Sequence, residues 1–334
     1  MGERRSKGKR VAAPMNRDGA LLYRGKMEEV ISQRLIVSVS PHIRAREDVR
    51  TIMSDVIFAL SPALGASIIF FGWRALLIVS VSIFFSVASE FFWQKLWRKK
   101  ITVGDLSPVV TGMLLAFVLP PSSPLWMVAI GAFVAITLGK QIFGGLGYNP
   151  FNPALVARAV LLASWPVYMT TWTKPFDGVT TASPLGIVKM ELDQRLPSYL
   201  EMFLGNRAGC LGEISVLALL LGAIYLLYRK QITWHIPVSY IGTVGLVCLL
   251  FNRDPLFNIM AGGLILGAFF MATDLVTSPL TRRGKLVFGV GCGLLTVLIR
   301  FTGGFPEGVC YSILIMNMLT PIIDKITEPK VFGS

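Results

Sequence analysis

Residues 143–150 read Phe143-Gly144-Gly145-Leu146-Gly147-Tyr148-Asn149-Pro150, and residues 301–308 read Phe301-Thr302-Gly303-Gly304-Phe305-Pro306-Glu307-Gly308. Each stretch ends one apolar run and leads into the next. Two further stretches open apolar runs upstream of these, Ser107-Pro108-Val109-Val110-Thr111-Gly112 and Asn258-Ile259-Met260-Ala261-Gly262-Gly263. Because similar breaks recur in the same order, the chain is predicted to contain two related halves of five apolar segments each.

Composition indicates where those segments lie. The chain is 53% hydrophobic with a mean hydropathy of +0.63, and its apolar runs recur from Val56 to Ile323. This composition places most of the chain in a bilayer and predicts an all-α polytopic membrane protein. The ten candidate spans are centred near Leu64, Ile83, Met113, Ile130, Val160, Leu219, Val244, Leu264, Leu294 and Ile315.

Some of these spans are short. The run from Leu106 to Leu119 stops at Pro120-Pro121, and the run from Leu286 to Ile299 lies between Lys285 and Arg300. Both fall below the roughly 20 residues that a full crossing needs, so we expect broken or re-entrant helices.

The number of segments in each half decides how the halves relate. Because five is odd, a second copy must cross the membrane in the opposite direction, which gives a 5+5 inverted repeat with a polar site where broken helices meet. We therefore expect five-helix repeats at 51–167 and 211–325. A basic cytoplasmic arm at 1–50, an extracytoplasmic loop at 168–210 and a cytoplasmic tail at 326–334 complete the predicted organisation.

The distribution of charge predicts the orientation. The net charge is +13, and twelve of the Lys and Arg residues lie in the arm at 1–50. The loops after spans two, four, six and eight hold Lys95, Arg98, Lys99, Lys100, Lys140, Arg229, Lys230, Arg282, Arg283 and Lys285. Fewer cations, Arg74, Arg253 and Arg300 among them, fall on the opposite face. The positive-inside rule then puts both termini in the cytoplasm. Since the excess charge lies beside membrane spans, its expected partner is anionic lipid, and nucleic acid is not expected.

Cysteine and histidine usage bears on metal and redox chemistry. Cys210, Cys248, Cys292 and Cys310 are scattered, without the close pairs that mark a metal or redox site. We expect no metal site and identify no catalytic residue, so electron-transfer chemistry would need an organic cofactor or another subunit.

A polar loop between apolar segments carries three hydroxyl groups. It reads Asp177-Gly178-Val179-Thr180-Thr181-Ala182-Ser183-Pro184. Small neighbours, a flexible glycine and the extended bias that Pro184 imposes on Ser183 suit a hydroxyl that another enzyme modifies. An ordinary Ser/Thr-rich turn is the alternative interpretation.

Polar residues near the breaks form a second candidate site. Asn149 and Asn152 precede span five, and their paired donors and acceptors suit the edge of a heterocyclic ring. The alternative is that they cap helices and satisfy backbone groups freed by the breaks. Other polar residues in or beside the spans are Glu90, Arg158, Asp274, Glu307 and Asn317.

Five segments together resemble the D subunits of the Rnf ion-translocating ferredoxin:NAD oxidoreductases. They are the segment 37–43, the run Gly144 to Ala154, the loop Asp177 to Leu185, the run Met271 to Pro279 and the run Gly303 to Val309. They occur in the family's order between about residue 35 and residue 325. The B subunits of the sodium-pumping NADH:quinone reductases are similar over less of the chain.

The resemblance implies a covalent FMN, attached through its phosphate to Ser or Thr by a separate flavin transferase outside the cytoplasm. Asp177, Thr180 and Ala182 match the family's attachment pattern, and its acceptor position falls on Ser183. Most family members have Thr there, and many have Gly or Ser where this chain has Thr181. The runner-up acceptor is therefore Thr181, followed by Thr180.

The resemblance also implies a function, partners and a location. The chain is expected to be a membrane subunit that relays electrons between ferredoxin and NAD while the complex moves Na⁺ or H⁺ across the bacterial cytoplasmic (inner) membrane. Further membrane and peripheral subunits would be its partners. A second, noncovalent flavin, riboflavin, would lie in the helix bundle, with Asn149 and Asn152 as its candidate contacts. The alternatives are a subunit of a sodium-pumping NADH:quinone reductase, a solute channel or transporter with an inverted repeat, and a purely structural membrane subunit.

Overall fold

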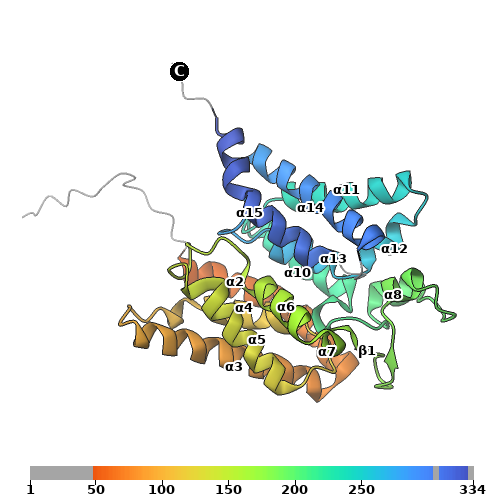
Figure 1. The fold of residues 1–334 in the computed structure, drawn as a ribbon, viewed down its shortest axis with the longest axis horizontal. Coiled ribbons are helices and arrows are strands. Elements are labelled where there is room, and N and C mark those ends of the chain that lie inside the picture. Colours follow the sequence, from red (N-terminus) through yellow and green to blue (C-terminus); the bar gives the residue numbers. More distant parts are fainter. Residues whose placement is uncertain (1–47, 304–307, 330–334) are drawn as a thin grey trace, which may run out of the picture. The chain divides into compact units, whose positions relative to one another are not determined.

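The computed structural model describes residues 48–303 and 308–329. Most of the predicted basic arm therefore lies outside the described residues, as do Glu307, the segment 37–43 and residues 330–334. Within the described residues the chain is helical apart from a short hairpin (Figure 1).

The first half is a set of apolar helices joined by short turns (Figure 1). Its elements are α2 (Val49–Phe71), α3 (Trp73–Leu96), η1 (Val103–Asp105), α4 (Ser107–Phe117), α5 (Leu125–Ile136), the π-helical turn η2 (Thr137–Gln141) and α6 (Pro153–Ser164). Each of the five span centres predicted for this half falls inside one of these helices.

The segment predicted as an extracytoplasmic loop has structure of its own. It begins within α7 (Pro166–Thr170) and contains β1 (Trp172–Thr173), β2 (Thr180–Thr181), α8 (Pro184–Lys189) and α9 (Tyr199–Leu204). The short helix η3 (Leu211–Glu213) follows it directly. The capping box of Ser198 with Glu201 begins α9.

The second half repeats the pattern of apolar helices. Its elements are α10 (Val216–Tyr228), α11 (His235–Leu250), α12 (Pro255–Met260), α13 (Leu264–Leu266), the π-helical turn η4 (Gly267–Met271), α14 (Arg282–Thr302) and α15 (Val309–Thr327). The five remaining span centres fall in α10, α11, α13, α14 and α15.

Helix length divides the apolar helices into two groups. Among the described residues, four helices are long and apolar enough to cross a membrane, namely α2, α3, α14 and α15. The helices at 107–117, 125–141, 153–164, 216–228 and 235–250 are shorter. The expectation of a short helix at Leu286–Ile299 is wrong, because α14 continues through Lys285 and Arg300. Arg300 lies in the last turn of α14, where its guanidinium reaches backbone carbonyls of other elements.

The predicted helix breaks at 107–121 and 258–263 are present. Backbone carbonyls that lose their helical hydrogen bonds at these breaks accept from arginine side chains. Pro120-Pro121 follows the end of α4, and Gly262 and Gly263 adopt φ of +67° and +68° between α12 and α13. Arg158 donates to the carbonyl of Val118 just past α4, and Arg300 donates to the carbonyl of Ala261 at the end of α12, at 2.9 Å. These bonds replace the helical ones lost at each break.

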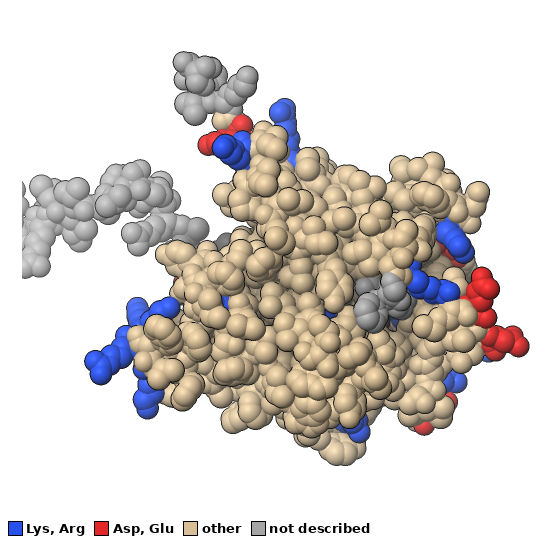
Figure 2. All heavy atoms as spheres, viewed as in Figure 1, with Lys and Arg blue, Asp and Glu red and all other residues tan. Residues whose placement is uncertain are grey.

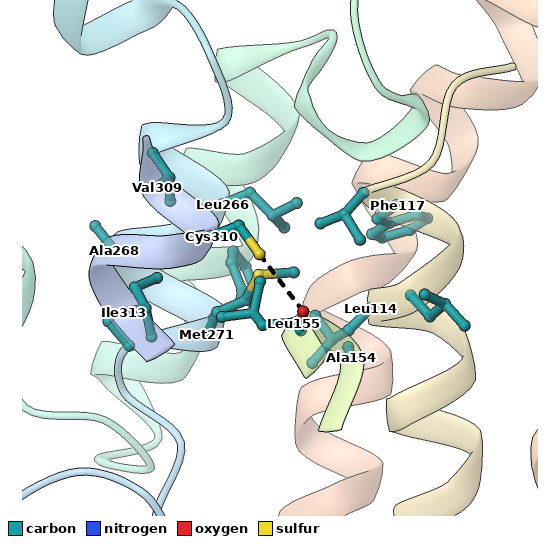
Figure 3. Packing of buried hydrophobic residues seen from close by; sticks show 14 of the residues in the cluster. Leu114, Phe117, Ala154, Leu155, Leu266, Ala268, Met271, Val309, Cys310 and Ile313 are labelled. Carbon is teal, nitrogen blue, oxygen red and sulfur yellow. Dashed lines mark hydrogen bonds between the residues drawn. The ribbon is translucent and has the colours of Figure 1, made fainter. Parts of the chain in front are cut away.

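The two halves share one apolar core. Helix α2 packs against α10, and α6 packs against α15. Figure 3 shows side chains of both halves meeting, where the Cys310 thiol donates to the carbonyl of Leu155 at 3.5 Å. Charged side chains lie almost entirely at the edges of the face drawn in Figure 2, which leaves a broad uncharged surface of the kind that contacts lipid.

Candidate functional site

The predicted modification loop forms a two-stranded hairpin that leads into α8. Trp172 pairs with Thr181 and Thr173 pairs with Thr180 in the antiparallel ladder. Because successive strand residues point to opposite faces, Thr180 is exposed whereas Thr181 is half-buried. Asp177 lies exposed at the tip, 3.4 Å from the ammonium group of Lys174.

The Ser183 hydroxyl sits at the start of α8. Only 5% of Ser183 is exposed, and its Oγ accepts a hydrogen bond from the backbone N–H of Gly186 at 3.1 Å. It therefore serves as the N-cap of α8. Esterification of Ser183 would require the first turn of α8 to open, whereas Thr181 is reached more directly.

Helix α8 is held against the second half by its own last residue. The ammonium group of Lys189 donates to the carbonyl of Arg300 at 3.0 Å and to that of Gly303. Burial lowers the pKa of Lys189. Through this contact the end of α14 positions the hairpin and the Ser183 turn.

A hollow of about 170 Å³ lies beside the hairpin. Thr181 and Ala182 line it together with the cations Lys174, Arg195 and Arg207 and one carboxylate, Glu201, which lies 3.7 Å from Arg195. Clustered guanidinium and ammonium groups favour a phosphate. The residues present therefore fit the phosphate end of an FMN attached to this segment.

A second site is a cavity of about 80 Å³ between the two halves, called the central cavity below. The first half contributes α2, α4, η2 and the segment 146–153, and the second half contributes α10, η4 and residues 273–275. Charged and polar residues among its lining are Ser107, Thr111, Lys140, Asn149, Asn152, Gln231, Thr273 and Asp274. The structure thus brings Asn149 and Asn152 together with groups more than a hundred residues away in the chain.

The two predicted asparagines have different environments in the central cavity. Asn152 caps α6, since its Oδ1 accepts from the N–H of Ala154 at 3.1 Å, and its Nδ2 donates to the carbonyl of Met271 at 3.3 Å. Asn149 is 4% exposed, and its Nδ2 donates to the carbonyl of Phe151, while its buried Oδ1 has no partner within 48–303 and 308–329. The capping interpretation is confirmed for Asn152, and Asn149 keeps an acceptor for a bound group.

A buried ion pair borders the same cavity. The Lys140 side chain in η2 is 1% exposed and that of Glu90 in α3 is 0% exposed, and the shortest distance between their charged atoms is 2.7 Å. The assignment of Lys140 to a charged loop is therefore wrong, and Arg300, counted among the charges of the opposite face, is also buried. Opposite charges inside two apolar runs were the sequence signal for this pair, because a lone buried charge is costly.

A carboxylate near the central cavity joins the two halves. Asp55 in α2 accepts from the hydroxyl of Tyr225 at 2.9 Å, from Nε of Arg229 at 3.2 Å and from Nε2 of Gln231 at 2.9 Å. Since Gln231 lines the cavity, this cluster connects the α2–α10 contact to the cavity wall.

Apolar helices of membrane-spanning length, arginines that satisfy broken helices and a polar cavity inside the bundle define a polytopic helical membrane protein. The sequence profile of the NQR2, RnfD, RnfE family matches residues 36–333, and the chain belongs to this family.

Individual relatives are similar over nearly their whole length. The chain is 49% identical to the D subunit of the proton-translocating ferredoxin:NAD(+) oxidoreductase complex of Clostridium ljungdahlii, with 89% of this chain and 96% of the relative covered. It is 49% identical to the D subunit of the Na(+)-translocating ferredoxin:NAD(+) oxidoreductase complex of Acetobacterium woodii, covering 90% and 95%. The D subunit of the ion-translocating oxidoreductase complex of Aliivibrio salmonicida is 37% identical, covering 89% and 98%.

Proposed function

We propose that the chain is the D-type membrane subunit of an Rnf-type complex, which couples electron transfer between ferredoxin and NAD to the movement of Na⁺ or H⁺ across the bacterial cytoplasmic membrane. The observation that carries this proposal is the 49% identity over about nine-tenths of the chain to two relatives with that named activity. The remaining subunits of such a complex are its partners. The chain itself would be a relay within the path of the electrons.

The proposed topology is ten crossings in a 5+5 inverted repeat, with both termini in the cytoplasm. Equivalent helices of the two halves pack in the same way, which supports this topology. Helix α3 packs on α5 as α11 packs on α14, and α5 packs on α6 as α14 packs on α15. The first helices of the halves, α2 and α10, also meet each other. The cations at 95–100, 229–230 and 282–285 support the orientation.

FMN is proposed to be esterified to Ser183, with Thr181 and then Thr180 as the alternatives. The hollow lined by Lys174, Arg195 and Arg207 supports a phosphate beside this segment. Asp177 and Ala182 would belong to the sequence that a flavin transferase reads. When bound, the flavin accepts electrons and passes them on, and a covalent tether fixes its distance to neighbouring redox groups.

Peptide mass spectrometry of the complex from its native host tests this attachment. The peptide that contains residues 175–189 should carry the mass of FMN, and fragmentation should place it on Ser183. Ser183→Ala should abolish the adduct, while Thr180→Ala should leave it in place. An unmodified wild-type peptide would overturn the proposal, and an adduct on Thr181 would reassign the acceptor.

Noncovalent riboflavin is proposed for the central cavity, in contact with Asn149 and Asn152. The unpartnered Oδ1 of Asn149 supports this placement, since it can accept from a ring N–H. Asn149→Ala should lower the flavin recovered by extraction with solvent while leaving the covalent adduct unchanged. Equal extractable flavin in the wild type and the variant would refute the contact.

Two other functions have an observation in their favour. The family description includes NQR2, which keeps an NADH:quinone reductase subunit in view, and the cavity between two halves is the arrangement of a transporter. Electron delivery from the purified complex to quinone in place of NAD would select the first. A denatured band without flavin fluorescence would select the second.

A further inference from the structure

We propose that Glu90 and Lys140 form a proton-transfer pair that supplies the central cavity with protons from the exposed loop at 97–102. The inference rests on the proposed electron-transfer function, because an organic group that is reduced in the cavity takes up protons as well as electrons.

The cavity side of the pair is the ammonium group of Lys140. Its Nζ donates to both carboxylate oxygens of Glu90, at 2.8 and 2.7 Å, and to Oγ of Ser107 at 2.6 Å. Lys140 and Ser107 both line the central cavity. These three bonds use all three N–H donors of the ammonium group, so a group bound in the cavity accepts a proton from Lys140 by taking the place of Ser107.

The side chain of Gln94 lies between the Glu90 carboxylate and the exposed loop at 97–102. Nε2 of Gln94 donates to Oε1 of Glu90 at 3.1 Å and to Oγ1 of Thr102 at 2.8 Å. Gln94 is buried, whereas Thr102 is exposed in the loop between α3 and η1. Oε1 of Gln94 also accepts from the N–H of Thr102 at 2.9 Å, so the proposed route opens when the Gln94 side chain leaves both Glu90 and Thr102.

The surrounding charges favour protons on this pair. Asp105 in η1 repels the Glu90 carboxylate and also accepts from Oγ of Ser107 at 2.6 Å. Asp274, behind η4, interacts with the charge of Lys140 from the other side of the cavity. Acidic side chains therefore lie near the pair, and a nearby negative charge stabilises an added proton.

Stability alone does not explain a buried pair of this kind. Removing two charges from water is costly, and well-packed apolar residues often replace such pairs without loss of stability. Charges inside a membrane bundle are by default functional. The position of this pair, between an exposed loop and a cavity, is the arrangement that proton transfer requires.

The transfer balances in protons and charge. The Lys140 ammonium gives its proton to a base in the cavity and becomes a neutral amine. The Glu90 carboxylate takes a proton from water at the loop while Gln94 is rotated away, and becomes a carboxylic acid. The acid then passes this proton to the Lys140 amine, which restores the ion pair. Each cycle carries a proton from the loop to the cavity, and no electron passes through either side chain.

The first test leaves the ion pair intact. Gln94→Leu keeps Glu90 and Lys140 but replaces the polar side chain between Glu90 and Thr102 with an apolar one. In the intact complex, ferredoxin-dependent NAD reduction should fall about tenfold or more, within the range of general acid–base effects, and its solvent deuterium isotope effect should rise. Flavin content should stay at the wild-type level. Wild-type turnover and isotope effect in Gln94→Leu would overturn the proposal.

The second test removes the pair. Glu90→Gln combined with Lys140→Met eliminates both charges together, so no lone charge remains buried. Assembly with full flavin, slow turnover and a raised isotope effect would support proton transfer, whereas wild-type turnover would show that the pair is structural. If this double variant does not assemble, Gln94→Leu decides the question.

Tyr240→Phe is the matched control. It removes a fully buried hydroxyl group that is hydrogen-bonded to Thr296 and Ser312, and Tyr240 does not line the central cavity. Its isotope effect should equal that of the wild type. A wild-type complex without ferredoxin:NAD activity would refute the proposed function itself. An active wild type with an unaffected Gln94→Leu variant would refute only the proton route.

Discussion

The close crossing of α2 and α10 makes Gly222 the position where a single methyl group should have the largest effect on the contact between the halves. A Cβ built on Gly222 lies 1.9 Å from the carbonyl oxygen of Ala59 and 3.1 Å from Cζ of Phe270. In proteins a Cβ atom essentially never lies within 3.0 Å of a heavy atom to which it is not linked through neighbouring bonds. The obstacle is backbone, so Gly222→Ala must separate the two helices by about 1 Å.

Two effects of opposite sign set the size of the change. Helix propensity favours Ala over Gly by about 1 kcal/mol, and overpacking costs about 1–3 kcal/mol, at the upper end where backbone must move. We therefore expect Gly222→Ala to lower the free energy of unfolding by about 2 kcal/mol. Gly242 in α11 has no atom within 4 Å of the equivalent Cβ, so Gly242→Ala should be neutral or stabilising.

Thermal unfolding of the detergent-solubilised protein, followed by tryptophan fluorescence, measures both variants against the wild type. Gly222→Ala should melt below the wild type and Gly242→Ala at or above it. Because Met53 and Val56 of α2 and Leu226 of α10 line the central cavity, the same separation should also weaken retention of any group bound there. Equal melting temperatures for the two variants would refute the close approach of α2 and α10.

Three further changes test particular contacts by the same melting assay or by proteolysis. Asp55→Asn removes a charge that accepts from Tyr225, Arg229 and Gln231, and it should lower the free energy of unfolding by about 1–3 kcal/mol. The control, Tyr228→Phe on the exposed side of α10, should leave the free energy of unfolding unchanged. Equal melting temperatures for the two variants would contradict the role of Asp55 in joining α2 and α10. Asn152→Ala removes the cap of α6 and the bond to Met271 and should cost about 1 kcal/mol, so an unchanged melting temperature would exclude the cap. Lys189→Ala frees α8 from the carbonyls of Arg300 and Gly303 and should speed limited proteolysis within 184–196, a rate that stays the same if α8 is held elsewhere.

The positions of the helices were predictable from local sequence. Every predicted span centre falls in a helix, since apolar runs of this length form helices wherever they lie in a bilayer. The breaks at Pro120-Pro121 and at Gly262-Gly263 were also predictable from local sequence, because proline restricts the backbone conformation and glycine widens it. The extent of α14 was not, because Arg300 in its last turn has backbone partners in another element that the sequence does not show.

The candidate sites show the same difference between features that local sequence predicts and features that depend on distant residues. The hairpin residues 177–183 and the two asparagines were identified from composition and spacing, and the structure places both asparagines in one cavity. The pairing of Glu90 with Lys140 was missed, because these residues are fifty positions apart and Lys140 followed an apolar run that looked complete. The N-cap role of Ser183 was missed as well, since the hydroxyl groups of a polar loop are equivalent until a helix begins beside one of them.

The amino-acid sequence by itself determined that this protein is a helical membrane protein, where its helices lie, and to which family it is similar. Those properties follow from the hydropathy and backbone preferences of neighbouring residues. Only the tertiary structure decided which charges are buried together, which asparagine oxygen stays unpaired and which threonine faces a cationic hollow. The physical reason is that burial and electrostatic partners depend on segments brought together from distant parts of the chain, and a linear pattern of residues does not specify those distances.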